Sequence, residues 1–462
     1  MSAATSLWTS AEIALATGGQ ASEPFEVSGV TFDSREVEEG HLFVAMPGTV
    51  ADGHQFVDRA FAKGAAAALV SQPCDHPHIL VPDVAQALNA LAVAARERVP
   101  HASILGVTGS VGKTSTKEAL AAALERRARG RVHRSVKSYN NHTGVPLSLA
   151  RMPRDTRFGV FEMGMNHEGE IRALTALVRP HVALITAIAP AHIENLGSIE
   201  AIADAKGEIF EGLEPHGVAI IPGDSAHCDR LRDAALAYAA KVVTFGRNHA
   251  DVTALHAVRA NNGGSMVTAR LRTSDVTFTV AQAGEHWVSN ALAVLAAVEA
   301  VGADLAAAGL ALADLGGLKG RGEHRRIALP DGGHALLIDE SYNANPASMA
   351  ATLANLAAEP CSGRRIAVLG TMRELGSHSD SAHAALVDPV RAAKVDELIL
   401  VGEETRPLET ALAGAVPVTL VADADAATAA LLERLRPGDV VLVKASNGVG
   451  LARLVERVAG DD

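Results

Sequence analysis

The feature that most constrains this chain is the segment ILGVTGSVGKTSTKEAL, residues 104–120. An apolar, strand-like run leads into a glycine-containing loop and then into a helical segment. Gly109 and Gly112 let backbone N–H groups approach an anion, and the helix N-terminus favours negative charge. Lys113 can reach terminal phosphates and Thr114 can face Mg²⁺. The segment predicts a phosphate-binding loop. An incidental glycine turn, the alternative, leaves the agreement of strand, loop, Lys-Thr pair and helix unexplained.

The order of apolar runs and helical segments predicts three α/β domains, as the length of 462 residues suggests. Residues 1–97 predict a small α/β module. Residues 98–320 alternate strand-like and helical segments, which predicts a doubly wound sheet of the P-loop ATPase type, and residues 264–280 predict a hairpin. A glycine-rich linker at 316–322 leads to residues 321–462, which predict a Rossmann-like α/β domain. Sheets of this kind bind ligands at the carboxyl ends of their strands, so a cleft between the two domains could hold a substrate.

Composition narrows the classes of function. The net charge is −12 and no long basic block occurs, which argues against nucleic acid or an anionic membrane surface as a partner. The longest apolar stretch, Trp287 to Leu318, is interrupted by acidic residues and glycine, so membrane insertion is not expected. Cys74, Cys228 and Cys361 have no spacing typical of zinc or disulfides, and the N-terminus has no basic leader. A cytoplasmic location is expected.

Three more side chains are candidates for a metal site. Glu162 ends the run GVFEM, so its carboxylate would lie at the carboxyl edge of the sheet, where it could bind a hard cation or simply cap a helix. His192 follows the next strand and could be a metal ligand, a proton carrier or only a loop histidine. Lys206 lies on a predicted helix, where composition alone favours a solvated surface lysine.

Several segments, in order along nearly the whole chain, resemble the Mur ligase family. They are TGSVGKTSTKE, Asn140-Asn141 before GVPLSL, FEMGMNHEGEI, APAHIENLGSIEAIADAKGEIF, GEHWVSNALA and LIDESYNANPASM. The resemblance implies an ATP-dependent amide ligase that activates a carboxylate as an acyl phosphate and joins it to an amine. The segment from Glu340 to Pro346 is similar to that of members that add D-alanyl-D-alanine to UDP-N-acetylmuramoyl-tripeptide, giving the pentapeptide, ADP and phosphate in peptidoglycan precursor synthesis. A DNPR-type motif, typical of relatives that add an amino acid, is absent.

The resemblance also implies roles for individual residues. The residues that would bind ATP are Thr108, Gly109, Ser110, Val111, Gly112, Lys113, Thr114, Ser115, Asn290, Arg325, Asp339 and Glu340. Those that would bind the substrates are Ser34, Arg35, Asn140, Asn141, Asn343 and Asn345. Two Mg²⁺ ions would be held by Thr114, Glu162, His192 and Lys206. The catalytic set would be Lys113, Lys206, His192 and Glu162.

Lys206 matches the lysine that the family carries as a carbamate. A neutral amine captures CO₂ and becomes an oxygen donor suited to Mg²⁺. Asn290 would read adenine, while Glu340 stands where aspartate is common, so either Asp339 or Glu340 could hold the ribose. Trp287 replaces a frequent asparagine beside the adenine site, and Thr371 a frequent aspartate. The segment at 444–447, KASN, departs from a KGSR-type segment.

Three other interpretations stay open. The chain could be a ligase of the same family that acts on another amino acid, on folate or on a polymer. It could be a P-loop kinase or GTPase, although the NKxD-type motif expected of a GTPase does not occur. It could also be an assembly protein that binds nucleotide without catalysis. A monomer is expected.

Overall fold

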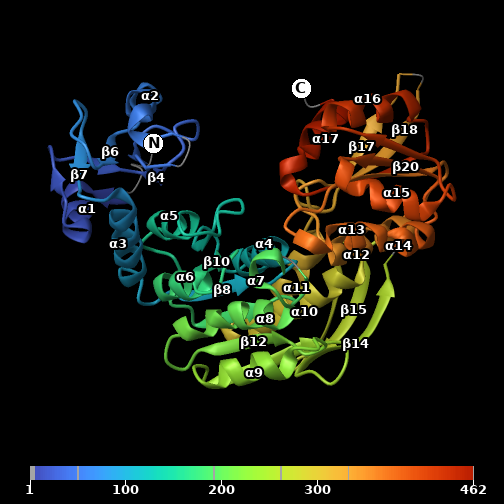
Figure 1. Cartoon of the computed structure of the whole chain (residues 1–462). Helices are drawn as coiled ribbons and strands as arrows, with labels where there is room; N and C mark the ends of the chain where they lie inside the picture. The colour runs from blue at the N-terminus through green and yellow to red at the C-terminus, as the bar shows by residue number, and fades with distance from the viewer. Residues whose placement is uncertain (1–5, 49–50, 191–192, 261–262, 331, 461–462) are drawn as a thin grey trace.

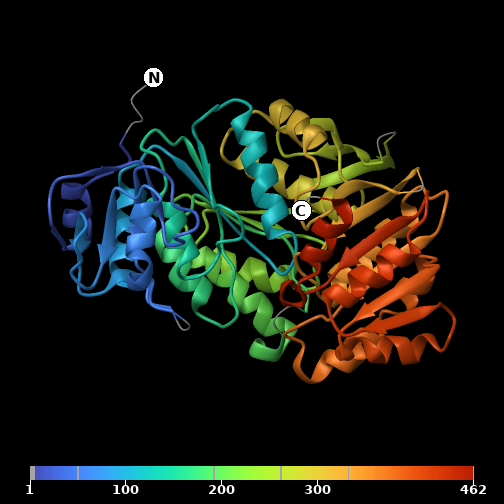
Figure 2. The same cartoon turned by 90° about the horizontal axis from the view of Figure 1, so that it is seen from above.

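The computed structural model describes residues 6–48, 51–190, 193–260, 263–330 and 332–460. These residues form three α/β bodies that follow one another along the chain, which confirms the predicted fold class (Figure 1). The N-terminal body lies at one end of the molecule and the C-terminal body at the other, with the central body between them (Figure 2). In the described residues no helix has the length and apolar character needed to cross a membrane.

The N-terminal body is built on a five-stranded sheet. Its strand order is β2 (Gln20–Ala21), β7 (His78–Leu80), β6 (Ala67–Val70), β5 (His41–Val44) and β4 (Gly29–Thr31). All pairs are parallel except that of β2 with β7. A two-stranded ribbon joins β1 (Trp8–Thr9) to β3 (Glu26–Val27). The helices are α1 (Ser10–Thr17), α2 (Val57–Ala62) and α3 (Val84–Glu97).

The central body is built on a nine-stranded sheet. The order is β16 (Asp275–Val280), β15 (Ser265–Arg270), β14 (Val252–Arg259), β13 (Lys241–Gly246), β12 (Val218–Pro222), β11 (Val182–Ile185), β8 (Ser103–Thr108), β10 (Phe158–Glu162) and β9 (Val132–Arg134). The strands from β9 to β14 are parallel, and β14, β15 and β16 are antiparallel. The hairpin predicted within residues 264–280 is formed by β15 and β16.

Helices cover both faces of this sheet, because its parallel strands are apolar on both sides. One core contains residues of α4 (Lys113–Glu125), α10 (Glu285–Ala300) and α11 (Leu305–Asp314). The other contains residues of α5 (Gly144–Ala150), α6 (Glu170–Val178), α8 (Ile199–Gly207) and α9 (Cys228–Leu236). The short helix α7 (Ile193–Leu196) contacts α8. The parallel arrangement brings the ends of β8, β10 and β11 to one edge of the sheet.

The C-terminal body has a six-stranded sheet. The order is β17 (Glu323–Ala328), β18 (His334–Glu340), β22 (Val440–Lys444), β19 (Arg365–Gly370), β20 (Glu397–Val401) and β21 (Val418–Val421). Only the edge strand β17 pairs antiparallel. One face is covered by α12 (Pro346–Ala358), α14 (Val387–Ala392) and α15 (Arg406–Leu412), beside α13 (Ser379–Ala384), and the other by α16 (Ala424–Arg434) and α17 (Leu451–Ala459).

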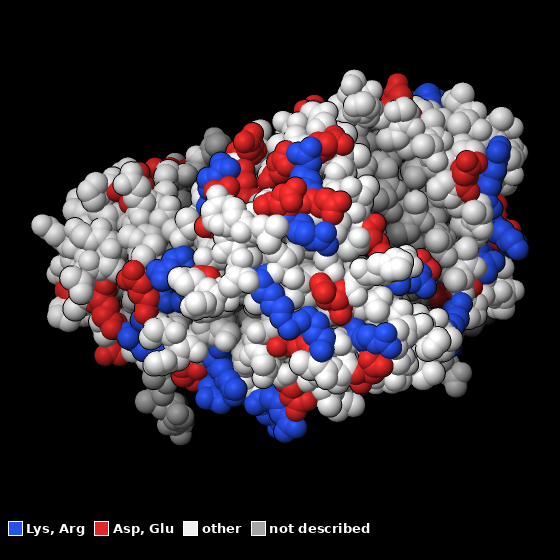
Figure 3. Space-filling model, turned by 90° about the horizontal axis from the view of Figure 1, so that it is seen from below, with Lys and Arg blue, Asp and Glu red and all other residues white. Residues whose placement is uncertain are grey.

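The N-terminal and central bodies are joined by specific contacts. The indole of Trp8 donates a hydrogen bond of 2.8 Å to the carbonyl of Ala150, and the guanidinium of Arg98 lies 3.7 Å from the centroid of that indole. A single apolar core contains Leu147 of α5 together with side chains of α1 and α3. Burial of this shared core holds the two bodies together. On the outer surface, basic and acidic side chains are interspersed over the face in Figure 3.

Candidate functional site

The loop between β8 and α4 requires glycine at two positions. Gly109 has φ +148°, and a Cβ atom there would lie 2.0 Å from Thr186 Oγ1. Gly112 has φ +82°, and a Cβ atom there would lie 2.9 Å from Asn290 Oδ1. The backbone therefore turns tightly against β11 on one side and α10 on the other. This geometry confirms that the sequence forms a strand, a compact glycine loop and a helix in succession.

The loop is anchored by hydrogen bonds to the segment after β11. Ser110 Oγ donates to the carbonyl of Ala189 at 2.9 Å, and Thr186 Oγ1 donates to the carbonyl of Val111 at 2.5 Å. Thr108 Oγ1 is buried and has no hydrogen-bond partner among the described residues. These contacts fix the loop while leaving the N-terminus of α4 open to a ligand.

Lys113 lies over this loop. Its ammonium group donates a hydrogen bond of 2.7 Å to the carbonyl of Gly109. Burial lowers the pKa of Lys113, and the nearby carboxylate of Glu162 opposes that shift. The bond to the Gly109 carbonyl keeps the cation close to the glycine loop.

Glu162, at the end of β10, is the centre of a polar cluster and is 1% exposed. Thr114 Oγ1 donates to its Oε2 at 2.9 Å, and Asn140 Nδ2 donates to its Oε1 at 2.8 Å. Ser138 Oγ lies 3.5 Å from Thr114 Oγ1. Adjacent parallel strands β8 and β10 bring the hydroxyl and the carboxylate together, so the cluster offers several oxygen atoms within a small volume.

A cavity of about 480 Å³ opens in front of this loop, between the central and C-terminal bodies. Of all the predicted site residues, those that line it are Ser110, Val111, Gly112, Lys113, Thr114, Ser115, Asn140, Glu162, Asn290, Glu340, Asn343 and Asn345. Those that do not line it are Ser34, Arg35, Thr108, Gly109, Asn141, Lys206, Arg325 and Asp339. The described structure thus brings most of the predicted nucleotide-binding residues to one cavity.

Asp339 and Glu340 are neighbours in the sequence but have different positions at the C-terminal wall of the cavity. Asp339 accepts hydrogen bonds from the backbone N–H groups of Gly320 at 2.9 Å and Ser341 at 3.0 Å, so it fixes the linker turn. Glu340 faces the cavity, where its Oε2 lies 3.4 Å from Lys444 Nζ. Burial lowers the pKa of Lys444, and Glu340 opposes the shift. Of the two carboxylates, only that of Glu340 is positioned to meet a ligand here.

Arg321 and Tyr342 were missed by the sequence analysis. The Arg321 guanidinium lies 4.1 Å from the centroid of the Tyr342 ring, and both side chains line the cavity. His286 and Ser138 line it as well. In the sequence, Arg321 is a basic residue within the glycine-rich linker. That position does not indicate that its aromatic partner is Tyr342. Its position beside the phosphate-binding loop makes it a candidate ligand for an anion.

Other predicted residues stabilise local structure. Asn141 Oδ1 accepts a hydrogen bond of 2.9 Å from the backbone N–H of Gly144, at the start of α5. Asn345 is the N-cap of α12 and accepts a bond of 2.9 Å from the backbone N–H of Ser348. Arg325, on β17, donates from its Nε to Glu323 Oε2 at 3.0 Å.

Lys206 is buried rather than solvated, since its exposed fraction is 1%. Its ammonium group makes no hydrogen bond or ion pair with any described residue. Burial lowers the pKa of Lys206 well below 10.5, and the charge of Lys113 lowers it further. Both effects favour the neutral form of the amine. The predicted ligand His192 lies outside the described residues.

Ser34 and Arg35 follow β4 on the N-terminal body. Ser34 is buried, whereas the side chain of Arg35 is 76% exposed and forms a two-point ion pair with Asp33, the shorter distance being 2.7 Å. The guanidinium hydrogen bond lowers the pKa of Asp33 to about 2. Arg35 therefore presents an oriented cation to solvent at the carboxyl edge of this sheet.

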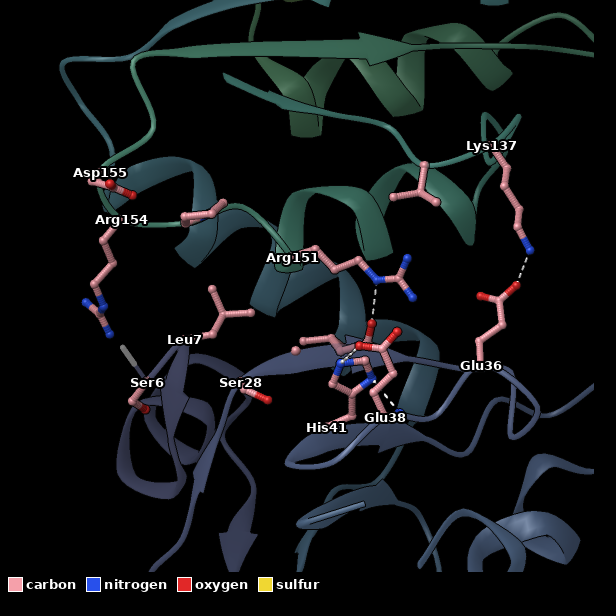
Figure 4. A pocket seen from close by; sticks show the side chains of 14 residues that line it. Ser6, Leu7, Ser28, Glu36, Glu38, His41, Lys137, Arg151, Arg154 and Asp155 are labelled. Carbon is pink, nitrogen blue, oxygen red and sulfur yellow. Dashed lines mark hydrogen bonds and ion pairs between the residues drawn. The ribbon is translucent and has the colours of Figure 1, made fainter. Parts of the chain in front are cut away.

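A second cavity, of about 870 Å³, lies between the N-terminal and central bodies (Figure 4). Arg151 reaches across it from the end of α5 and donates from its Nε to the carbonyl of Val30 at 2.5 Å. Lys137 and Glu36 form an ion pair on another part of its wall. The starts of β4 and β5 contribute lining residues such as His41, so this cavity opens at the edge of the N-terminal sheet opposite the end of β4.

Comparison with known proteins identifies the family. Residues 26–107 match the Mur ligase family, catalytic domain; residues 107–298 match the Mur ligase middle domain; and residues 320–447 match the Mur ligase glutamate ligase domain. The chain is 38% identical to UDP-N-acetylmuramoyl-tripeptide–D-alanyl-D-alanine ligase of Escherichia coli (strain K12), with 83% of each chain covered. It is 34% identical to the protein of that name from Synechocystis, covering 96% of this chain and 94% of the relative.

Solved structures agree in fold. MurF from Acinetobacter baumannii superposes with a TM-score of 0.84 at 29% identity, covering 98% of this chain and 99% of that one. MurF ligase from Thermotoga maritima in complex with ADP superposes with a TM-score of 0.75 at 27% identity, covering 94% and 97%. The matches extend over all three bodies, including the glycine loop and the cavity that faces it. This chain belongs to the Mur ligase family.

Proposed function

We propose that this chain is an ATP-dependent ligase that joins D-alanyl-D-alanine to UDP-N-acetylmuramoyl-tripeptide, giving UDP-N-acetylmuramoyl-pentapeptide, ADP and phosphate. The supporting observation is one cavity in which a phosphate-binding loop, the Thr114–Glu162 pair and the C-terminal side chains Arg321 and Glu340 meet. Relatives named for this reaction cover most of the chain. The reaction belongs to peptidoglycan precursor synthesis, and we place it in the cytoplasm, where ATP is available, with the enzyme acting as a monomer.

Each of the three bodies has its own binding role in the proposed reaction. Residues 98–320 bind ATP, with its phosphates on the loop from Gly109 to Ser115 and its base beside Asn290. Residues 1–97 bind the UDP part of the substrate through Ser34 and Arg35, whose guanidinium can pair with a diphosphate oxygen. Residues 321–462 close on the nucleotide and bind the incoming dipeptide, with Asn343 and Asn345 at their edge of the cavity.

The oxygen cluster around Glu162 fits Mg²⁺, which takes few protein ligands and keeps water and phosphate oxygens in its remaining positions. Thr114 and Glu162 supply a hydroxyl and a carboxylate 2.9 Å apart beside the phosphate-binding loop. When bound there, Mg²⁺ would neutralise phosphate charge and polarise the γ-phosphoryl group. The second predicted ion would use His192 and a carbamate on Lys206.

The environment of Lys206 supports the carbamate. Its amine is buried, its pKa is well below 10.5, and no described carboxylate pairs with it. A neutral amine can attack CO₂, with loss of one proton, to give a carboxylate-like group. That group would carry the negative charge that the buried site lacks in the described residues.

The chemistry then proceeds in two steps. An oxygen of the substrate carboxylate attacks the γ-phosphorus of ATP, the bond to the β-γ bridging oxygen breaks, and ADP leaves. The dipeptide amine next attacks the acyl carbon, the bond to the phosphate oxygen breaks, and inorganic phosphate and one proton are released. Lys113 and Arg321 hold the phosphate charge, and the C-terminal wall of the cavity excludes water that would otherwise hydrolyse the acyl phosphate.

The identity of the product tests this proposal. Mass analysis of a reaction containing ATP, Mg²⁺, the UDP-linked tripeptide and D-alanyl-D-alanine should show the pentapeptide. Replacing the dipeptide with single amino acids, or the UDP substrate with a folate, should give no product. A product with either replacement and none with the dipeptide would assign the chain to another ligase of the family.

A further inference from the structure

Lys117 is a buried lysine that the proposed chemistry does not use. It lies on α4, one helical turn after Thr114, and its exposed fraction is 0%. Its ammonium group donates to the carbonyl oxygens of Ser135 at 2.9 Å and Lys137 at 2.6 Å, and lies 3.0 Å from Glu118 Oε1. The buried ammonium is thus held by two hydrogen bonds to carbonyl groups and by an ion pair.

The same ammonium lies 3.8 Å from Glu162 Oε2. Glu162 is 1% exposed, so the nearby cations Lys117 and Lys113, rather than solvent, balance its charge. Its two oxygens also receive hydrogen bonds from Thr114 and Asn140. Glu162 lines the cavity, whereas Lys117 does not. Lys117 therefore contacts the carboxylate from behind, outside the cavity.

Lys117 also holds a segment that has no helix or strand of its own. Residues 135–143 connect β9 to α5 without regular structure, so each of their carbonyl groups depends on an individual partner. Two of those carbonyls accept from Lys117. Ser138 and Asn140, which line the cavity, lie on this segment. Lys117 therefore contacts both Glu162 and the segment that carries Asn140, whose amide donates to Glu162 Oε1.

We propose that Lys117 is a positioning residue of the magnesium-nucleotide site. It holds the carboxylate of Glu162 and the segment 135–140 in position relative to Thr114, without touching the ligand. The inference rests on the proposed role of Glu162 as a ligand to Mg²⁺. A purely structural role is the alternative, since a buried, paired lysine can serve stability alone.

The test compares Lys117→Met, which keeps an unbranched side chain one atom shorter and removes the donors and the charge, with Arg134→Gln. Arg134 is the matched control, because it pairs with Glu118 at 2.7 Å on the exposed side of the same network. Nucleotide binding is followed with a fluorescent ATP analogue during a Mg²⁺ titration, so the result does not depend on amide synthesis. Hydrogen exchange of residues 135–140 is measured in protein free of metal and nucleotide.

We expect Lys117→Met to raise the Mg²⁺ concentration at half-saturation by about tenfold or more, the range found when groups that orient metal ligands are removed. Exchange in residues 135–140 should become faster, and Arg134→Gln should change neither reading by more than about twofold. A lower melting temperature with an unchanged Mg²⁺ titration would assign Lys117 to stability and overturn the proposal.

If Lys117→Met does not fold, Lys117→Gln replaces it, because the amide keeps two donors for the carbonyl groups and removes the charge. The same shift in the Mg²⁺ titration supports the proposal, and an unchanged titration contradicts it. Wild-type protein that binds the nucleotide with Mg²⁺ but forms no pentapeptide would refute the proposed function while leaving this test valid.

Discussion

Thr114 and Glu162, 48 positions apart in the sequence, are joined by a hydrogen bond of 2.9 Å from the hydroxyl to Oε2. The bond links the start of α4 to the end of β10. It exists because β8 and β10 are parallel neighbours, with Glu162 paired in register with Val107. The glycine loop and a carboxylate thereby share one edge of the central sheet, where we propose that a magnesium-nucleotide complex binds.

Removing either member of this pair should impair catalysis more than nucleotide binding. We expect Thr114→Ala and Glu162→Gln each to lower kcat by about 100-fold, because the loss of a metal ligand costs several kcal/mol of charge stabilisation in the transition state. Steady-state kinetics over a range of Mg²⁺ concentrations measures this. Variants with kcat within about twofold of wild type would remove the pair from the metal site.

Lys206→Ala should abolish ligase activity, because the site would lose the carbamate oxygens. Short-chain carboxylic acids added to the variant should restore part of the activity, since they can supply the missing carboxylate. The assay is phosphate release with and without the added acid. Full activity of the variant without any acid would contradict the carbamate.

The buried amine of Lys206 should also make stability depend on pH. In the unfolded chain Lys206 keeps its ordinary pKa of about 10.5, whereas in the folded protein its pKa is lower. Between the folded and unfolded pKa values the unfolded chain binds more protons, so stability falls as pH decreases from 10.5. In CO₂-free buffer, Lys206→Met should therefore melt at a higher temperature than wild type at pH 7, with a smaller difference at pH 9.5. Equal melting temperatures at both pH values would argue against the shift.

Arg321→Ala should weaken ATP binding. The guanidinium stacks on Tyr342 and lines the cavity beside the phosphate-binding loop, so its loss removes a positioned cation. We expect the KM for ATP to rise by about tenfold, the effect of losing roughly one charge-assisted hydrogen bond. Lys319→Ala is the matched control, because Lys319 is a linker cation that pairs with Glu456 and does not line the cavity. A similar change in both variants would assign the effect to the linker.

Arg35→Ala should act on the UDP-linked substrate alone. We expect the KM for that substrate to rise by about tenfold while the KM values for ATP and the dipeptide stay within about twofold, because Arg35 lies on the N-terminal body away from the nucleotide cavity. Initial-rate kinetics with each substrate varied in turn gives all three constants. An effect on ATP would place Arg35 in a different role.

The elements that sequence could predict are those fixed by local pattern. Residues 321–462 form the α/β domain that their sequence predicts, because apolar runs such as 366–370 and 440–444 are buried as the parallel strands β19 and β22. The glycine loop predicted between a strand and a helix lies between β8 and α4. The strand β13, at 241–246, and the edge strand β17, at 323–328, were not assigned. The sequence of β17, EHRRIA, is rich in charge and forms a strand because it pairs with β18.

The site was less accessible from sequence where tertiary contacts decide it. The choice between Asp339 and Glu340 depended on which side of β18 meets the linker turn, and only the fold shows that Asp339 binds Gly320. Composition favoured a solvated Lys206, whereas packing of α8 buries it. The stacking of Arg321 on Tyr342 joins the linker to the segment after β18, a relationship that neither segment reveals alone.

The proposed reaction couples phosphate transfer from ATP to the joining of two substrates. Phosphate release should be measured with UDP-N-acetylmuramoyl-tripeptide and D-alanyl-D-alanine supplied separately and together, in the presence of Mg²⁺. We predict sustained release only when both are present, with one phosphate for each pentapeptide formed. No release with both substrates, or equal release without the dipeptide, would contradict the account.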